Sequence, residues 1–283
     1  MAVGLVGEGS ECFGFDDEIS RDHDWGPAFC IWLPQEVLAA NSGRLDSVLA
    51  ELPRQFEGFE VRMTDPRLRM GRVGPLPLEL FYQRFLNVPR APENLMEWRR
   101  IPEQYLAVAT NGEVFQDNLG TFSAIREKLL AFYPEDLRLK KIAARIMAAS
   151  QAGQYNLPRM LRRCDFVACD IRARFIEAVL STVFLINRKY VPFYKWAFRA
   201  VKQLPLMGMS IAEKLEHLVS LPLMETMPEA VAEPVEGICQ EIADHLQSEG
   251  LLDSNDPWLF AQGPVIQAHI ENNALRSMPP QLE

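Results

Sequence analysis

Residues 2–26 read AVGLVGEGSECFGFDDEISRDHDWG. The first six residues form an apolar run that ends in glycine, which is typical of a short buried strand. Seven of the twenty residues from 7 to 26 are Asp or Glu, and such crowding of negative charge is costly unless something positive lies beside it. The pattern therefore predicts a strand followed by a cation-binding loop.

Gly9 and Ser10 stand at the start of that loop. Glycine lets the backbone approach a phosphate closely, and the serine hydroxyl and neighbouring backbone N–H groups are hydrogen-bond donors for phosphate oxygens. We therefore predict that Gly9 and Ser10 hold the phosphates of a nucleotide.

The second half of the stretch predicts a metal site. The sequence RDHDWGPAFCIWLP, residues 21–34, reads as a strand that ends at proline. Asp22 and Asp24 then share one face and His23 points to the other, because side chains alternate along a strand. The two Cα atoms lie about 6–7 Å apart, so both carboxylates reach one divalent cation or a pair of cations. Such oxygen ligands favour Mg²⁺ or Mn²⁺, and His23 is interpreted as structural.

EGS, eleven residues and then DHD resemble the pattern of the nucleotidyltransferase superfamily. The chain departs from that pattern at Glu8 and His23, where apolar residues are usual. The superfamily usually carries a third carboxylate on a neighbouring strand. The segment GFEVRMT, residues 58–64, reads as a strand and supplies Glu60 as this third metal ligand or as the base, with Glu57 and Asp65 as alternatives.

Four longer blocks resemble a bacterial family of nucleotidyltransferase-like proteins of unknown function. That resemblance implies a nucleotidyltransferase fold joined to a helical domain, similar in layout to the antibiotic adenylyltransferases. Members usually carry more chain before the first strand. The blocks are GSECFGFDDEISRDHDWGP, IPEQYL, GEVFQDNLGTFSAIREKLLAFYPED and NRKYVPFYKW, the last at residues 187–196.

The NRKYVPFYKW block adds candidate nucleotide-binding residues. The resemblance implies that Lys195 contacts the β- and γ-phosphates, and that Tyr190 or Tyr194 stacks on the base or bonds a phosphate. The alternative is a junction between two helices that carries surface cations.

Two further groups of polar residues have a structural and a functional interpretation. Asp170, Arg174 and Glu177 fall on one face of a predicted helix, which is favoured to be a solvated ion-pair face over an acceptor site. Asp117 and Arg126 are interpreted as a helix cap or an ion pair in preference to cleft residues.

The predicted fold is α+β. A nucleotidyltransferase (polymerase-beta-like) domain with a mixed sheet is expected over 1–118, including helices over 34–56 and 93–109. After residue 120 the apolar residues follow helical periodicity, so a helical-bundle domain is expected over 119–283.

Composition limits the possible classes of protein. The chain has 283 residues and a net charge of −9, which makes a nucleic-acid partner unlikely. Its five cysteines follow no disulfide framework, and neither a signal peptide nor an apolar run long enough for a bilayer is evident. A cytoplasmic protein without membrane association is expected.

The function that these patterns favour is Mg²⁺-dependent nucleotidyl transfer. A nucleoside monophosphate, AMP if the substrate is ATP, would move from a nucleoside triphosphate to a hydroxyl of a small-molecule acceptor. Two alternatives stay open. One is a catalytically silent nucleotide-binding or interaction module, and the other is an antitoxin-like nucleotidyltransferase that acts on protein or RNA.

Overall fold

The computed structural model describes residues 1–22, 25–222 and 227–283, and of Asp22 the backbone alone. The predictions made for His23 and Asp24 therefore fall outside the described residues. The chain divides into two compact units, the N-terminal unit Met1–Phe132 and the helical unit Tyr133–Glu283.

The division follows helix α7 (Thr121–Leu130), whereas the sequence analysis placed the boundary at 118/119. The physical reason is packing. Helix α7 lies against strand β6 (Glu113–Asp117) and helix α6 (Glu103–Thr110), so it belongs to the N-terminal unit although its periodicity matches that of the later helices.

The N-terminal unit combines a small sheet with helices, as predicted for an α+β protein. The described residues form a four-stranded sheet in the order β5-β2-β1-β6, in which β1 is antiparallel to β2 and β6, and β5 is parallel to β2. The sheet is therefore mixed. Its remaining strands are β1 (Ala2–Leu5), β2 (Cys30–Leu33) and β5 (Gly74–Pro77), and the other elements of the unit are α1 (Ser10–Phe13), a 3₁₀ turn η1 (Ile19–Asp22), α2 (Gln35–Ala50), the hairpin β3 (Gln55–Phe56) and β4 (Phe59–Glu60), α3 (Pro66–Arg69), α4 (Leu78–Leu86) and α5 (Leu95–Arg100).

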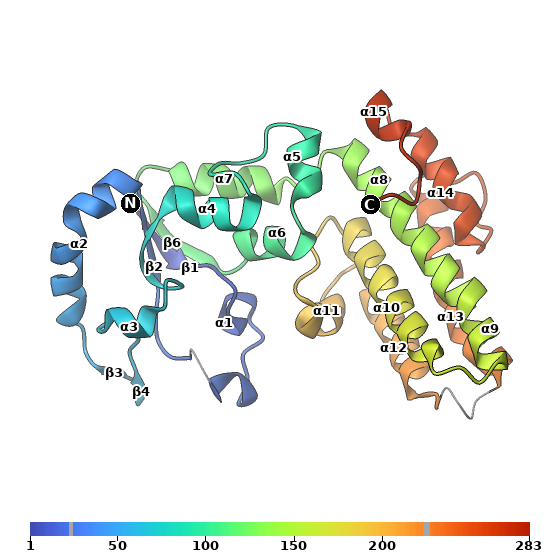
Figure 1. Cartoon of the computed structure of the whole chain (residues 1–283), viewed down its shortest axis with the longest axis horizontal. Coiled ribbons are helices and arrows are strands. Elements are labelled where there is room, and N and C mark those ends of the chain that lie inside the picture. Colours follow the sequence, from blue (N-terminus) through green and yellow to red (C-terminus); the bar gives the residue numbers. More distant parts are fainter. Residues whose placement is uncertain (23–24, 223–226) are drawn as a thin grey trace. The chain divides into compact units, whose positions relative to one another are not determined.

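An aromatic core joins the sheet to the helices. Helix α4 packs against β5, α7 packs against β6, and α6 contacts both helices (Figure 1). The buried ring of Trp32 on β2 lies 4.1 Å from the ring of Phe122 on α7 and 5.3 Å from that of Phe81 on α4, measured between centroids. Rings at such distances add to the free energy of burying their large apolar area. The core therefore fixes β2, and with it the strand order, beneath the two helices.

Two predicted strands are shorter than expected. The strand predicted over 21–34 begins at Cys30, because the acidic loop forms η1 up to Asp22. The strand predicted over 58–64 is confined to Phe59–Glu60 and pairs with β3 alone. Glu60 is consequently on a separate two-stranded hairpin, and the expectation that it stands on a neighbouring strand of the main sheet was wrong.

Proline also divides a predicted helix. The helix expected over 93–109 is interrupted between α5 and α6 at Ile101 and Pro102. The ring of Pro102 removes a backbone donor and favours an extended preceding residue, so Ile101 takes extended dihedral angles and α6 restarts after Pro102.

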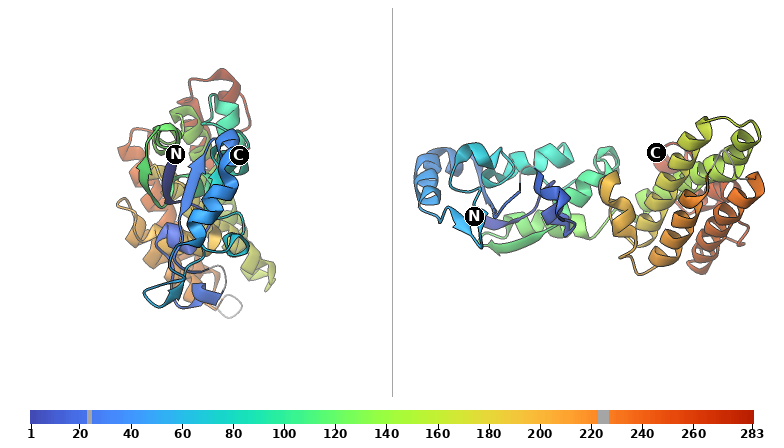
Figure 2. Two further views of the ribbon diagram at one scale, coloured as in Figure 1. Left: turned by 90° about the vertical axis from the view of Figure 1, so that its left-hand side faces the viewer. Right: turned by 90° about the horizontal axis from the view of Figure 1, so that it is seen from below.

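The helical unit is a bundle, as the periodicity after residue 120 predicts. Its helices lie side by side, with α8 against α10 and α14, and α12 against α13 (Figure 2). Its elements are α8 (Glu135–Ala149), a π-helical segment η2 (Ser150–Asn156), α9 (Leu157–Arg162), α10 (Val167–Ile186), α11 (Tyr194–Val201), α12 (Gly208–Ser220), α13 (Pro228–Ser248), α14 (Leu259–Ala268) and α15 (Asn273–Arg276).

The π-helical segment has a local cause. Pro158, near the start of α9, cannot donate to the carbonyl of Gln154, and its ring would clash with that carbonyl in a continuing α-helix. The wider turn of η2 accommodates the proline without ending the helix. Gly153 within η2 allows a close approach to Phe175 of α10, because an added Cβ would lie 2.4 Å from the phenyl ring.

Across the part of the chain that the structure describes, no helix has the length and apolar character needed to cross a membrane.

Candidate functional site

The turn that follows β1 is anchored from two sides. The Gly7 N–H donates to Asn111 Oδ1 at 3.1 Å, and Asn111 Nδ2 donates to the Gly7 carbonyl at 2.7 Å. Glu8 forms an ion pair with Arg84 at the end of α4. The residue that departs from the family pattern at position 8 thus ties the turn to a neighbouring helix.

The predicted phosphate-binding residues lie directly after these anchors. Gly9 is extended and precedes α1, and half-buried Ser10 is the first residue of that helix. The carbonyls of both accept backbone bonds, from Cys12 at 3.1 Å and from Phe15 at 3.0 Å. The Gly9–Ser10 pair therefore sits in a tight backbone turn whose shape is set by its own hydrogen bonds.

The acidic loop is ordered by Asp17. Its carboxylate accepts from the backbone N–H groups of Ile19 at 3.1 Å and Ser20 at 3.0 Å, and the Ser20 hydroxyl donates to the Asp17 carbonyl at 2.8 Å. Such local bonds are typical of short polar side chains in loops. These bonds start η1, which ends at Asp22, so the backbone of Asp22 is helical where a strand was predicted.

A cation–aromatic cluster connects this loop to the β3–β4 hairpin. The Arg21 guanidinium lies 4.9 Å from the Trp25 ring and 5.6 Å from the Phe59 ring, and the two rings meet edge to face at 4.6 Å. Arg21 and Trp25 flank residues 22–24 in the sequence, and Phe59 precedes Glu60. The Arg21–Trp25–Phe59 cluster thus brings both ends of the acidic segment to the strand that carries Glu60.

Backbone contacts continue this association. An added Cβ on Gly26 would lie 2.7 Å from the Glu60 carbonyl, and the Arg62 N–H donates to the Pro27 carbonyl at 3.2 Å. Residues 26–27 and 60–62 therefore run alongside each other. The Glu60 side chain is exposed.

Glu57 and Asp65, the two alternatives to Glu60 as third carboxylate, lie at the hairpin turn and at the start of α3. Glu57 is exposed at the hairpin turn, with a positive φ of 49°. Asp65 begins α3, accepts from the Arg67 N–H at 2.8 Å and forms a bidentate pair with the Arg67 side chain. Hydrogen bonds from Arg67 lower the pKa of Asp65 to about 2. Asp65 is thus engaged within α3, and Glu60 is the carboxylate whose backbone lies beside the acidic segment.

The donor set fits a hard divalent cation by its chemistry, since Asp22, Asp24 and Glu60 offer carboxylate oxygens. Within residues 1–22, 25–222 and 227–283, no three His, Cys, Asp or Glu side chains gather as metal ligands would. Two members of the predicted set, Asp24 and the Asp22 side chain, are not among the side chains described there.

The candidates in the helical unit divide into a buried and an exposed group. Tyr190 is buried edge-on against Tyr133, with ring centroids 5.1 Å apart, and burial raises the pKa of its hydroxyl. Tyr194, which begins α11, is 91% exposed, and the Lys195 ammonium lies 4.4 Å from the Trp196 ring. The Tyr190 ring is therefore occupied by packing, whereas Tyr194 and Lys195 lie on the surface.

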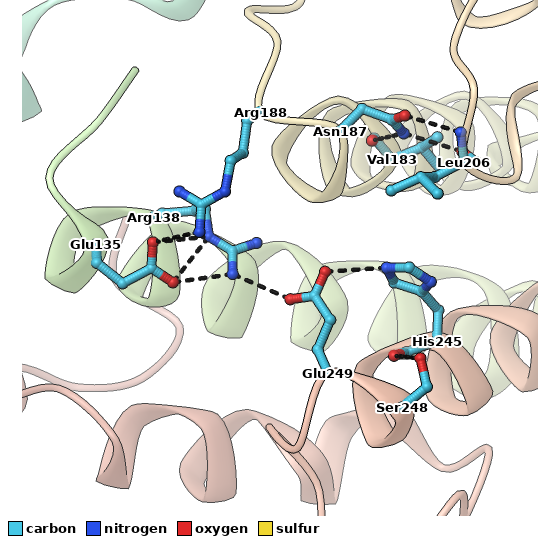
Figure 3. A network of polar contacts seen from close by, with 9 residues as sticks. All are labelled: Glu135, Arg138, Val183, Asn187, Arg188, Leu206, His245, Ser248 and Glu249. Atoms are coloured by element: carbon cyan, nitrogen blue, oxygen red, sulfur yellow. Dashed lines mark hydrogen bonds and ion pairs between the residues drawn. The ribbon is translucent and has the colours of Figure 1, made fainter. Parts of the chain in front are cut away.

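Sequence reasoning missed an ion-pair network in the helical unit (Figure 3). Arg138 on α8 is 3% exposed and pairs with Glu135 at 2.9 Å and with Glu249 at 3.0 Å. Arg188 donates to Glu135 at 2.8 Å, and His245 Nε2 lies 3.0 Å from Glu249. The i, i+3 spacing of Glu135 and Arg138 and the i, i+4 spacing of His245 and Glu249 are signals for two of these pairs. Burial of Arg138 is not visible in such spacing.

The remaining polar candidates have structural roles. Asp170 and Arg174 form an exposed pair at 2.8 Å, in agreement with a solvated face. Asp117 accepts from the N–H groups of Gly120 at 3.0 Å and Ser123 at 2.9 Å, which caps α7 as expected. Arg126 donates to backbone carbonyls in the turn before β6.

Comparison with known proteins adds one match. A family model described as a domain of unknown function (DUF4037) matches residues 98–197. This range includes three of the four sequence blocks noted above and spans the boundary between the two units. No curated protein and no solved structure matches the chain.

Proposed function

We propose that the protein is a metal-dependent nucleotidyltransferase that transfers a nucleoside monophosphate from a nucleoside triphosphate to a hydroxyl of a small-molecule acceptor. The observation that carries the proposal is the association of the acidic loop with the β3–β4 hairpin. Trp25 contacts Phe59 at 4.6 Å, and Gly26 lies against the Glu60 backbone. Residues on either side of Asp22–Asp24 in the sequence thus contact the hairpin that carries Glu60.

Each group has a defined task in this proposal. The Gly9–Ser10 turn binds phosphate oxygens through its backbone and hydroxyl. Asp22, Asp24 and Glu60 would hold Mg²⁺, which would supply positive charge against the negative charge that develops on the phosphate during transfer. Glu60, if it is not a ligand, would take the proton of the acceptor hydroxyl, and its exposure leaves the carboxylate accessible.

The pairing of Glu8 with Arg84 also supports the proposal. A cation near the turn would otherwise compete with bound metal for the acidic residues, and this guanidinium is already neutralised by Glu8. Arg21 is stacked on Trp25 and Phe59. Both Arg84 and Arg21 are thus engaged by other groups.

The test is calorimetric titration of ATP, GTP, CTP and UTP with and without Mg²⁺. We expect Mg²⁺-dependent binding of one nucleotide to the wild type. In Asp22→Asn, Asp24→Asn and Glu60→Gln we expect binding weakened by about tenfold or more, since even the outer-shell partners of metal ligands are worth about 10- to 100-fold.

Matched controls share the loop and the hairpin. Asp16→Asn removes an exposed acid from the same loop, and Glu57→Gln removes one from the same hairpin. Both should bind as the wild type does. Absence of Mg²⁺-dependent binding to all four nucleotides would overturn the proposal, as would equal affinity for Glu60→Gln and Glu57→Gln if Asp22→Asn and Asp24→Asn also matched the wild type.

A further inference from the structure

The turn between α6 and β6 reaches the nucleotide-binding loop at two points. The Asn111 side chain exchanges two hydrogen bonds with the backbone N–H and carbonyl of Gly7, at 3.1 and 2.7 Å. The next residue, Gly112, donates its N–H to the Cys12 carbonyl at 2.8 Å. Residues 7 and 12 bracket Gly9 and Ser10, so both ends of the proposed phosphate-binding turn are held by one short segment.

That segment is itself rigidly fixed. Gly112 has a φ of +59°, and an added Cβ would lie 1.8 Å from the Leu5 carbonyl oxygen. Arg126 on α7 donates to the Asn111 carbonyl at 2.6 Å and to the Gly112 carbonyl at 3.1 Å. Strand β1 on one side and helix α7 on the other thereby determine where the Asn111 amide points.

We propose that Asn111 is a positioning residue for the nucleotide phosphates, a role that rests on the function proposed above. A carboxamide presents a donor and an acceptor in one plane, which is the pattern required to satisfy both the N–H and the carbonyl of one residue. Asn111 thereby sets the orientation of the two peptide groups on either side of the Gly7 Cα and, through them, of the Gly9–Ser10 backbone. Arg126 acts behind it by holding the Asn111 carbonyl.

The chemistry of the amide suggests a selective variant. In Asn111→Asp the ionised carboxylate still accepts from the Gly7 N–H but faces the Gly7 carbonyl without a donor. Protonation of the carboxyl restores that donor. The variant is therefore expected to recover as the pH falls, which loss of packing would not produce.

The experiment measures the Kd of MgATP between pH 5 and pH 8. The Kd of each variant is divided by the Kd of the wild type at the same pH, because this ratio removes the effect of titration of the nucleotide and of groups that both proteins share. At pH 8, Asn111→Asp should bind about tenfold or more weakly, because the bond to the Gly7 carbonyl is lost and that carbonyl is left facing a carboxylate oxygen. Its ratio should fall towards 1 as the pH is lowered to 5, because the facing carbonyl favours the protonated carboxyl. Asn111→Ala should be weakened by about fivefold or more at every pH.

Asn118→Asp is the matched control. Asn118 is exposed at the other end of β6, and its Oδ1 accepts from Gln116, which an aspartate also does. The variant adds the same charge near the same strand and should keep the wild-type affinity. A ratio for Asn111→Asp that equals the control, or that does not change with pH, would overturn the positioning role. If Asn111→Asp does not fold, wild-type affinity in Asn111→Ala would do so.

A measurement without nucleotide separates this inference from the proposed function. Hydrogen exchange of the peptide covering residues 7–12 should be faster in Asn111→Asp than in the wild type at pH 8 and similar to it at pH 5. Failure of the wild type to bind MgATP, together with this pH-dependent exchange, would refute nucleotide binding and leave the control of the loop by Asn111 in place. Unchanged exchange in a variant that folds would refute that control.

Discussion

Removal of the Phe59 ring tests whether the Arg21–Trp25–Phe59 cluster holds the acidic loop against the hairpin. Phe59→Ala deletes an edge-to-face contact at 4.6 Å and a cation–aromatic contact at 5.6 Å. The first is worth about 0.5–1.5 kcal/mol and the second about 0.5–1 kcal/mol at an exposed site. Their sum, about 1–2.5 kcal/mol, corresponds to a roughly 5- to 70-fold larger equilibrium constant for separation of the two segments.

The reporter is the backbone N–H of Arg62, which bonds the Pro27 carbonyl across the two segments at 3.2 Å. We expect its exchange with solvent deuterium to accelerate by that factor in Phe59→Ala. The Kd of the bound Mg²⁺–nucleotide complex should increase in the same variant, because Glu60 follows Phe59.

Phe56→Ala is the matched control for this experiment. Phe56 pairs with Phe59 across the hairpin and is 60% exposed, and its removal deletes the same ring from the same hairpin. It should leave the Arg62 exchange rate close to that of the wild type. Equal Arg62 exchange rates in Phe59→Ala and Phe56→Ala would refute the holding role of the cluster.

Three further predictions concern the rest of the chain. Gly153→Ala should lower the free energy of unfolding by about 1–3 kcal/mol, because its Cβ would lie 2.4 Å from the Phe175 ring. Gly237→Ala within α13 should raise it by about 0.5–1 kcal/mol, because the nearest atom to its Cβ would lie at 3.8 Å. Thermal unfolding checks both variants, and equal effects would contradict the packing argument. A thiol reagent should label the exposed Cys164 and Cys169 in the native protein and the other three cysteines only after denaturation. Cys12, Cys30 and Cys239 are buried, and burial raises the pKa of their thiols. Fast labelling of more than two thiols in the native protein would contradict this. Partial burial acts to raise the pKa of Glu135, but hydrogen bonds and charges from Arg138 and Arg188 outweigh it, and the pKa is lowered. This carboxylate therefore stabilises the fold above its unfolded pKa of about 4.3, and the stabilisation is lost as the pH falls through the folded pKa. Glu135→Gln should therefore reduce the melting temperature at pH 7 by an amount equivalent to at most about 1 kcal/mol, because Glu135 is 47% exposed, and the gap to the wild type should close in acid; a gap that widens in acid would contradict the sign.

Several elements of the fold could be predicted from local pattern. The apolar run at residues 2–7 is strand β1, and the helical spacing over 34–56 is α2 (Gln35–Ala50). The capping role of Asp117, one of the two structural interpretations given for it, was also confirmed. Such features depend on hydrogen bonds and side-chain periods within a few residues, which the order of amino acids specifies directly.

The two predicted strands over 21–34 and 58–64 were too long because the length of a strand depends on backbone partners outside it. The first was predicted from an aromatic stretch that ends at proline and the second from alternation, yet each contains a much shorter strand. A strand needs a neighbour that satisfies its N–H and carbonyl groups. In the first segment the bonds of Asp17 favour a 3₁₀ turn, and in the second the chain turns at Glu57 to pair with β3 alone.

The amino-acid sequence alone thus determined β1, α2, the helical character of the second unit and the α+β class, and it nominated the candidate residues of the site. Tertiary structure alone decided which of these residues meet. Asn111 bonds Gly7 across 104 residues, and Arg138 reaches Glu249 across 111. Every charged or polar side chain has many compatible partners elsewhere in the chain. The choice among them is made by the packing of the sheet and helices, which brings a particular pair within hydrogen-bond distance and excludes water around it.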